Sequence, residues 1–169
     1  MTVSHRRSEN RTRSPIKRRP APAATHVNPV FHAATRLADA MISATQAQTD
    51  PRTLLAWGEH IGVSRGTLRV WCRAAHTPAR ACLDFLRLLR AVQLAQHHAW
   101  DLFGLLDVVD ARSIASLLDR GGVRVLLTQT TPPSIAEFRA MQSFIERPDI
   151  VRAVEKRLAA KGFAMSRRK

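Results

Sequence analysis

At 169 residues, the chain is long enough for one compact domain, or for two small helical units that share a core, and too short for most large catalytic scaffolds. Its 27 Lys and Arg residues outnumber 13 Asp and Glu residues, for a formal net charge of +14. This excess favours an anionic partner, with nucleic acid or an anionic membrane as the first candidates. The absence of tyrosine excludes every mechanism that needs a phenolic nucleophile, including those of tyrosine recombinases and relaxases.

The composition predicts an all-α fold. Hydrophobic residues make up 45% of the chain and aromatic residues only 5%, and Ala and Leu, which favour helices, dominate the apolar set. No stretch approaches the roughly 18 apolar residues that cross a bilayer, and the N-terminus has no apolar secretory segment. We therefore expect a cytoplasmic protein without a membrane partner, in which Cys72 and Cys82 are small buried hydrophobes rather than a disulfide.

The positive charge is unevenly distributed. Residues 1–20 and 152–169 each sum to +6 and residues 51–90 to +5, whereas residues 21–50 sum to −1 and residues 91–151 to −2. Both ends lack the apolar residues that would offset the entropy of ordering. We expect residues 1–27 to form a disordered basic tail and linker, residues 28–99 and 100–162 to form two helical units, and residues 163–169 to form a basic C-terminal tail.

Helix start and stop signals divide the first unit into four helices. Asn28 followed by Pro29 begins an amphipathic helix that ends near Gln48, and Asp50 followed by Pro51 repeats this start signal. The second helix ends at Gly62, and Ser64 caps a third. The sequence Thr77 and Pro78 begins the longest helix, which we expect to reach about His98.

The second unit carries similar signals. Asp110 is expected to cap a helix that runs through Leu118 and stops at Gly121 and Gly122, and residues 128–133 break the chain. Ser134 with Glu137 forms a capping box for a helix to about Glu146. An Asp149 cap then begins a last helix that ends at Gly162.

Residues 50–63 are echoed at an offset of sixty by residues 110–123. Beyond Val123 the echo fails, because residues 124–127 run into Thr128 and Pro132 before another helix can form. We interpret residues 100–162 as a degenerate unit that packs against the first or forms a homodimer surface.

Residues 50–73 have the proportions of a helix-turn-helix: a short helix, a three-residue turn with glycine, and a second helix with a serine cap. Leu68 and Trp71 form the inward face of that second helix. Arg65, Arg69 and Arg73 recur every four residues, so that they share one side of the helix.

Each residue of this segment has an expected role in contact with duplex DNA. Arg65 and Arg69 are free to pair with guanine in the major groove, and Gly66 between them lets the backbone approach closely. Thr67 can reach a phosphate or a thymine methyl group. The predicted DNA-binding set is Arg52, Ser64, Arg65, Gly66, Thr67, Arg69 and Arg73, with Arg52 on a phosphate.

These residues resemble the DNA-binding region of AraC-type transcriptional regulators. The matching positions are Leu54, Gly62, Val63, Ser64, Thr67, Leu68, Thr77, Pro78, Arg87, Leu88 and Ala91. They reproduce that family's glycine, hydrophobic, serine turn and its Thr-Pro start of a long helix with an Arg-Leu pair, over roughly 45 residues. The sequence departs from the family at Val70, at Cys72 and in the spacing from Pro78 to Arg87. The resemblance implies a helical DNA-binding transcription regulator.

Two other interpretations stay open. The basic helix could bind an acidic protein surface, as in an antitoxin or an adaptor, or the tails alone could bind RNA or the nucleoid without sequence preference. The sequence has neither the Cys and His spacing of a zinc site nor paired carboxylates, a serine elbow or a phosphate-binding glycine loop. We therefore expect no metal, no cofactor and no enzymatic activity.

Overall fold

A computed structural model describes residues 29–162, so the predicted tails and the Asn28 cap lie outside the described residues. The described part has eight α-helices, one 3-10 helix and no strand, and it confirms the all-α prediction. The elements are α1 (Pro29–Ala44), α2 (Leu54–Ile61), α3 (Arg65–Ala74), α4 (Ala79–Leu94), α5 (Leu102–Leu105), α6 (Ala111–Arg120), η1 (Arg124–Leu127), α7 (Ile135–Met141) and α8 (Pro148–Ala160).

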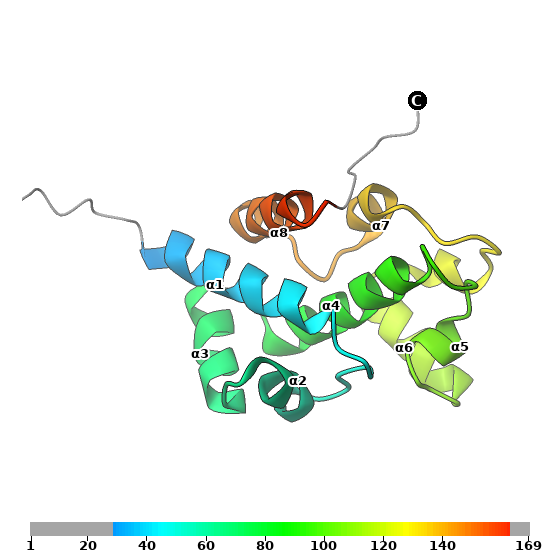
Figure 1. Ribbon diagram of the computed structural model, residues 1–169, viewed down its shortest axis with the longest axis horizontal. Helices are drawn as coiled ribbons and strands as arrows, with labels where there is room; N and C mark the ends of the chain where they lie inside the picture. The colour runs from blue at the N-terminus through cyan, green and yellow to red at the C-terminus, as the bar shows by residue number, and fades with distance from the viewer. Residues whose placement is uncertain (1–28, 163–169) are drawn as a thin grey trace, which may run out of the picture.

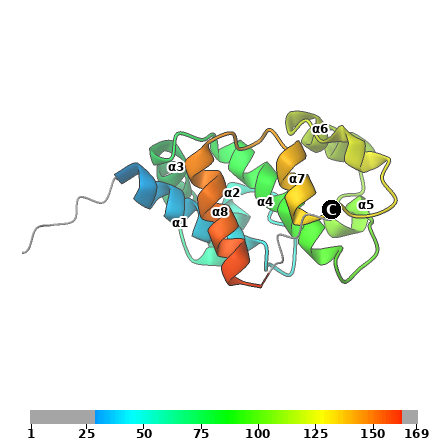
Figure 2. The same cartoon turned by 90° about the horizontal axis from the view of Figure 1, so that it is seen from above.

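The helices form three layers, and α1 and α4 make up the middle layer (Figure 1). Helices α2, α3, α5 and α6 lie on one side of this pair, and α7 and α8 lie on the other, with α8 against α1 and α7 against α4 (Figure 2). Buried residues from both predicted units belong to a single hydrophobic cluster. The core is therefore continuous across residue 100.

Helix α1 is the element on which the first and last parts of the fold meet. Ala34, Leu37 and Met41 are completely buried, and α1 packs against α3 and α4 as well as α8. Its small and apolar residues leave room for helices on two sides. An ion pair between Asp39 and Arg157 of α8 lies at the edge of this contact.

Buried polar side chains of α4 hold the connection between α1 and α2. Arg90 donates hydrogen bonds to the carbonyl oxygens of Ala47 at 2.9 Å, Gln48 at 2.7 Å and Leu105 at 2.8 Å. These bonds satisfy three backbone acceptors, of which the carbonyl of Ala47 lies in a buried contact. Arg90 thereby fixes the entry of the chain into α2.

The predicted start of α2 at Asp50 is wrong. The N-cap is Thr53, whose hydroxyl accepts a hydrogen bond from the amide of Ala56, and Asp50 is instead buried against Arg87 of α4. A carboxylate next to a proline resembles a cap in sequence, but here a distant guanidinium on another helix binds it. The Gly62 stop and the Ser64 cap are confirmed.

Several other helix ends differ from the predictions. Helix α1 ends at Ala44 rather than near Gln48, α4 ends at Leu94 rather than about His98, and α7 ends at Met141 rather than about Glu146. Arg147 occupies the N-cap position of α8 without a side-chain capping bond and Pro148 follows in the first turn, so the predicted Asp149 cap is wrong, and Asp149 pairs with Arg147 instead. The Asp110 cap and the Ser134 and Glu137 capping box are confirmed.

Candidate nucleic-acid interface

The connection from α2 to α3 is a three-residue turn, Gly62 to Ser64. Gly62 has a φ of +73°, a conformation that favours glycine, and the amide of Val63 donates a 2.8 Å hydrogen bond to the carbonyl of Gly58. The Ser64 hydroxyl then accepts a 3.0 Å hydrogen bond from the amide of Thr67. A tight stop and a capped start together fix the direction in which α3 leaves α2.

The fold limits the side chain at Gly58 but not at Gly66. A Cβ at Gly58 would lie 2.4 Å from the carbonyl oxygen of Val63, so the turn passes too close to α2 for any side chain. A Cβ at Gly66 would meet only the Ser64 hydroxyl, at an ordinary 3.4 Å. The fold therefore requires glycine at position 58 but not at position 66.

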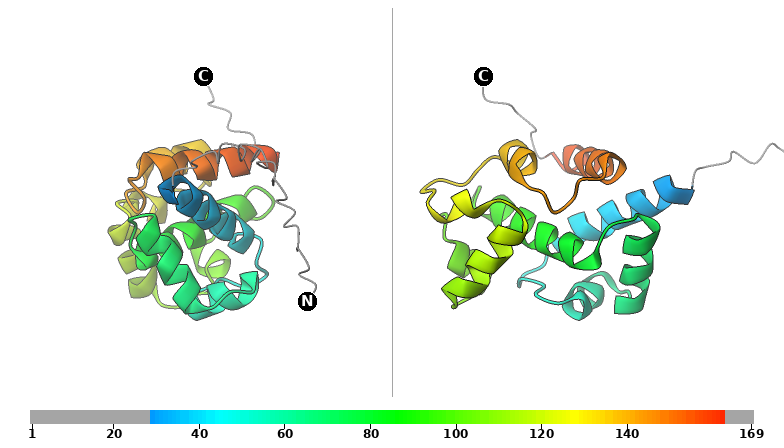
Figure 3. Two further views of the ribbon diagram at one scale, coloured as in Figure 1. Left: turned by 90° about the vertical axis from the view of Figure 1, so that its left-hand side faces the viewer. Right: turned by 180° about the vertical axis from the view of Figure 1, so that it is seen from behind.

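The outer face of α3 carries the predicted arginine row. Arg65, Arg69 and Arg73 are all exposed, while Leu68 and Cys72 on the opposite face are buried. Helix α3 packs on α1, α2 and α4, and α8 lies on the other side of α1 (Figure 3). Within residues 29–162, none of these three arginines makes an ion pair, so their donors are available to a ligand.

Val70, which has no role in the predicted DNA-binding set, and Thr67, which belongs to that set, also lie on α3. Val70 is 58% exposed and lies among the arginines. Its position four residues after Gly66 predicts that it shares a face of the helix with Gly66. Thr67 is half-buried, and its hydroxyl lies 2.9 Å from that of Ser64. Thr67 thus belongs to the cap of the helix as much as to its outer surface.

A shallow groove of about 430 Å³ runs beside α3. Arg65 and Arg69 of α3 line this groove together with Arg52 from the loop before α2, Leu55 from the first turn of α2 and Arg80 from the first turn of α4. Arg52, which the sequence analysis assigns to a phosphate, is one of the residues that line this groove. Arg80 was not singled out in sequence, because its distance from the turn hides its place in space.

Two of the arginines that give residues 51–90 their positive charge are internal. Arg87 and Arg90 are 6% and 4% exposed; Arg87 pairs with Asp50, and Arg90 binds backbone carbonyls. Burial raises the pKa of the Asp50 carboxyl, and the Arg87 guanidinium opposes that rise. The charge that can reach a partner comes instead from Arg52, Arg65, Arg69, Arg73 and Arg80.

The described residues 29–162 contain no cluster of metal-binding side chains. No three His, Cys, Asp or Glu side chains gather there in a way that could hold a metal ion. Cys72 and Cys82 are buried free thiols, and a hydrogen bond between them together with burial raises the pKa of the Cys82 thiol far above its usual value. No helix in the described part is both long and apolar enough to span a bilayer.

Comparison with known proteins adds no family to this description. The chain matches no protein-family model, and no curated protein or solved structure shows significant similarity to it.

Proposed function

We propose that this protein binds double-stranded DNA in a sequence-specific manner and acts as a transcription regulator of the helix-turn-helix type. The observation that carries the proposal is the exposed row of Arg65, Arg69 and Arg73 on a helix whose other face is buried. A recognition helix needs this division, because it must be held by its own domain while its side chains enter the major groove.

The residues of α3 have complementary roles in this proposal. Arg65 and Arg69 donate paired hydrogen bonds to O6 and N7 of guanine, and exposed Val70 contacts a thymine methyl group. Gly66 lets the backbone approach the base edges. Arg52 and Arg73, at the margins of the face, bind phosphates, and Ser64 with Thr67 fixes the start of the helix.

A homodimer fits this proposal. One helix contacts few base pairs, so such proteins commonly bind two half-sites through a dimer. Phe103, Val109, Val125 and Leu127 are exposed apolar side chains of the second half, where we place the contact between the two copies. A regulator of this type works in the cytoplasm, where a bacterial chromosome lies.

Selection from a pool of randomised duplexes tests the proposal. We expect a defined motif, and we expect affinity for it to fall with salt at a slope of about −5 on logarithmic axes if about six phosphates are neutralised. Arg69→Ala should weaken binding to the motif by about 1–3 kcal/mol and relax the preference at one base pair. The matched control is Arg152→Ala, at an exposed arginine of α8, a helix that lies on the other side of α1 from α2 and α3 (Figure 1).

Two results would reject the proposal in favour of its alternatives. If Arg65→Glu with Arg69→Glu leaves DNA affinity unchanged while a protein partner is lost, α3 binds an acidic protein surface. If deletion of residues 1–20 and 163–169 abolishes all duplex binding and the full chain selects no motif, the ends alone bind nucleic acid. A motif that survives the deletion supports α3 as the source of specificity.

A further inference from the structure

A second groove, of about 440 Å³, lies between α4 and α6 and is lined by arginines from three separate parts of the chain. It shares Arg52 and Arg80 with the groove beside α3. Helix α6 adds the polar residues Arg112, Ser113, Ser116 and Arg120 and the apolar residues Ile114 and Leu117. Helices α2 and α6 lie on the same side of α4 (Figures 1 and 3), and the two grooves adjoin at Arg52 and Arg80, which line both.

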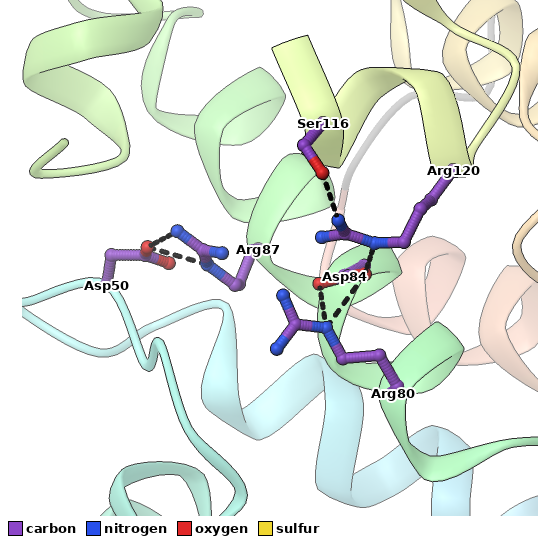
Figure 4. A network of polar contacts seen from close by, with 6 residues as sticks. All are labelled: Asp50, Arg80, Asp84, Arg87, Ser116 and Arg120. Atoms are coloured by element: carbon purple, nitrogen blue, oxygen red, sulfur yellow. Dashed lines mark hydrogen bonds and ion pairs between the residues drawn. The ribbon is translucent and has the colours of Figure 1, made fainter. Parts of the chain in front are cut away.

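A buried carboxylate orients two of these arginines. The side chain of Asp84 is 1% exposed, and it binds Nε of Arg80 at 3.0 Å and Nε of Arg120 at 2.7 Å (Figure 4). Arg120 also donates a 2.8 Å hydrogen bond to the hydroxyl of Ser116. Arg80 remains 57% exposed and Arg120 38% exposed. Contact through Nε leaves the terminal nitrogens of Arg80 and one terminal nitrogen of Arg120 outside these bonds, in guanidinium groups that are already oriented.

The balance of charge in this groove is positive. Asp84 neutralises one of its two arginine partners, so the trio keeps one positive charge. Arg52 and Arg112 are exposed and make no ion pair within residues 29–162. The carboxylate of Asp110 is engaged by the amides of Arg112 and Ser113 and by the Ser113 hydroxyl. The groove thus offers several guanidinium donors to an anion, although residues 91–151 have a net negative charge in sequence.

Helix α6 ends as α2 does but is not followed by a second exposed helix. Gly122 has a φ of +66°, sixty positions after Gly62, and the amide of Val123 bonds to the carbonyl of Leu118 at 3.0 Å, as Val63 bonds to Gly58. The next element is only the four-residue η1. The arginines that the second unit adds to the groove therefore lie on α6, the counterpart of α2, and not on a counterpart of α3.

We propose that α6 binds the sugar-phosphate backbone of the same duplex that α3 reads, with Arg112, Arg120 and Arg80 as the phosphate ligands. This inference rests on the proposed function, because it extends the α3 interface along the shared residues Arg52 and Arg80. In it, the second unit supplies affinity and orientation but no sequence readout, since phosphate contacts carry no sequence information directly.

The first test compares Arg112→Gln with Arg152→Gln in the full-length protein. Each variant removes one exposed positive charge, from α6 or from α8. Arg112→Gln should reduce the magnitude of the salt slope by about one and weaken binding to the selected motif and to random duplex by the same factor. Arg152→Gln should leave the slope unchanged.

A crosslinking experiment gives an independent readout. Ala111→Cys places a reactive thiol at the exposed start of α6, and the buried Cys72 and Cys82 should not be modified by a photoreactive maleimide. We expect crosslinks at one fixed position outside the base pairs that α3 contacts. The same label on Arg152→Cys should give none.

The outcomes separate this inference from the proposed function. If Arg69→Ala relaxes the motif but Arg112→Gln behaves like Arg152→Gln, and Ala111→Cys does not crosslink, α3 reads DNA without help from α6 and the inference fails alone. If the unaltered protein binds no duplex, both fail. A smaller salt slope for Arg112→Gln together with a fixed crosslink supports the inference.

Discussion

Asp50 and Arg87 are 37 positions apart, and Nε of Arg87 donates a 2.7 Å hydrogen bond to the Asp50 carboxylate inside the molecule. The pair joins the loop before α2 to the middle of α4, and both side chains are less than a tenth exposed. Because α2 supports the turn that directs α3, this internal contact positions the proposed DNA-binding helix without touching DNA.

Removal of one member of this pair should be costly. Arg87→Met leaves the Asp50 carboxylate buried without its cation, and we expect a loss of about 3–5 kcal/mol in the free energy of unfolding at pH 7. The loss should shrink as the pH falls, because a protonated Asp50 no longer needs a cation. Urea unfolding followed by circular dichroism at pH 5 and pH 7 measures both effects. The matched control is the double variant with Asp50→Leu, which should recover much of the stability; an equal loss at both pH values would contradict the argument.

Gly66→Ala should separate stability from DNA binding. A Cβ fits at this position, so the change should raise stability by up to about 1 kcal/mol through helix propensity. In the proposed complex the same methyl group separates α3 from the base edges and weakens binding to the motif. Thermal unfolding and duplex titration of one sample give the two values.

Gly58→Ala provides the contrast to Gly66→Ala. Its Cβ would overlap the Val63 carbonyl, so we expect a loss of stability of about 1–3 kcal/mol. Unchanged stability in Gly58→Ala would show that the turn can move away from α2.

Asp110 should contribute to stability in a pH-dependent way. Hydrogen bonds from the Ser113 hydroxyl and from the amides of Arg112 and Ser113 lower the pKa of this carboxyl. A folded-state pKa below the unfolded value gives a contribution that is present above the unfolded pKa and is lost as the pH falls through the folded pKa. Asp110→Asn keeps a capping oxygen but does not titrate, so its stability should fall less steeply below pH 4. If the free energy of unfolding falls equally with pH in the unaltered protein and in Asp110→Asn, the lowered pKa of Asp110 does not contribute to stability.

Phe144 should be the most sensitive residue of the segment between α7 and α8. Its ring covers Gly121 so closely that a Cβ there would lie 2.0 Å from the ring, and the amide of Ser143 bonds to the Gly121 carbonyl at 2.9 Å. Phe144→Ala should cost about 3–5 kcal/mol in chemical denaturation. Gly121→Ala should also destabilise, whereas the exposed Glu146→Ala should change stability little.

Local signals in the sequence predict the local structure well. The Ser64 and Asp110 caps, the Gly62 stop and the capping box at Ser134 each depend on residues a few positions apart, and all four are present. The exposure of Arg65, Arg69 and Arg73 follows from helical periodicity in the same way.

Long-range contacts explain what the sequence did not predict. The sequence predicts Asp50 as a helix cap, because it does not show that the partner of Asp50 is on another helix. Arg87 and Arg90 contribute to the positive charge of residues 51–90 in sequence, but tertiary packing buries them away from any partner. The second groove was missed for the same reason, since Arg80, Arg112 and Arg120 come together only when α4 and α6 pack.

The packing of α8 on α1 constrains how this protein can be divided and made. The apolar side of α1 that packs against α8 would face water in any fragment that stops before residue 148. A fragment spanning residues 28–99 would therefore be prone to aggregate, although it contains α2 and the proposed recognition helix α3. During synthesis on the ribosome, the same surface of α1 stays exposed until α8 has been made and can pack against it.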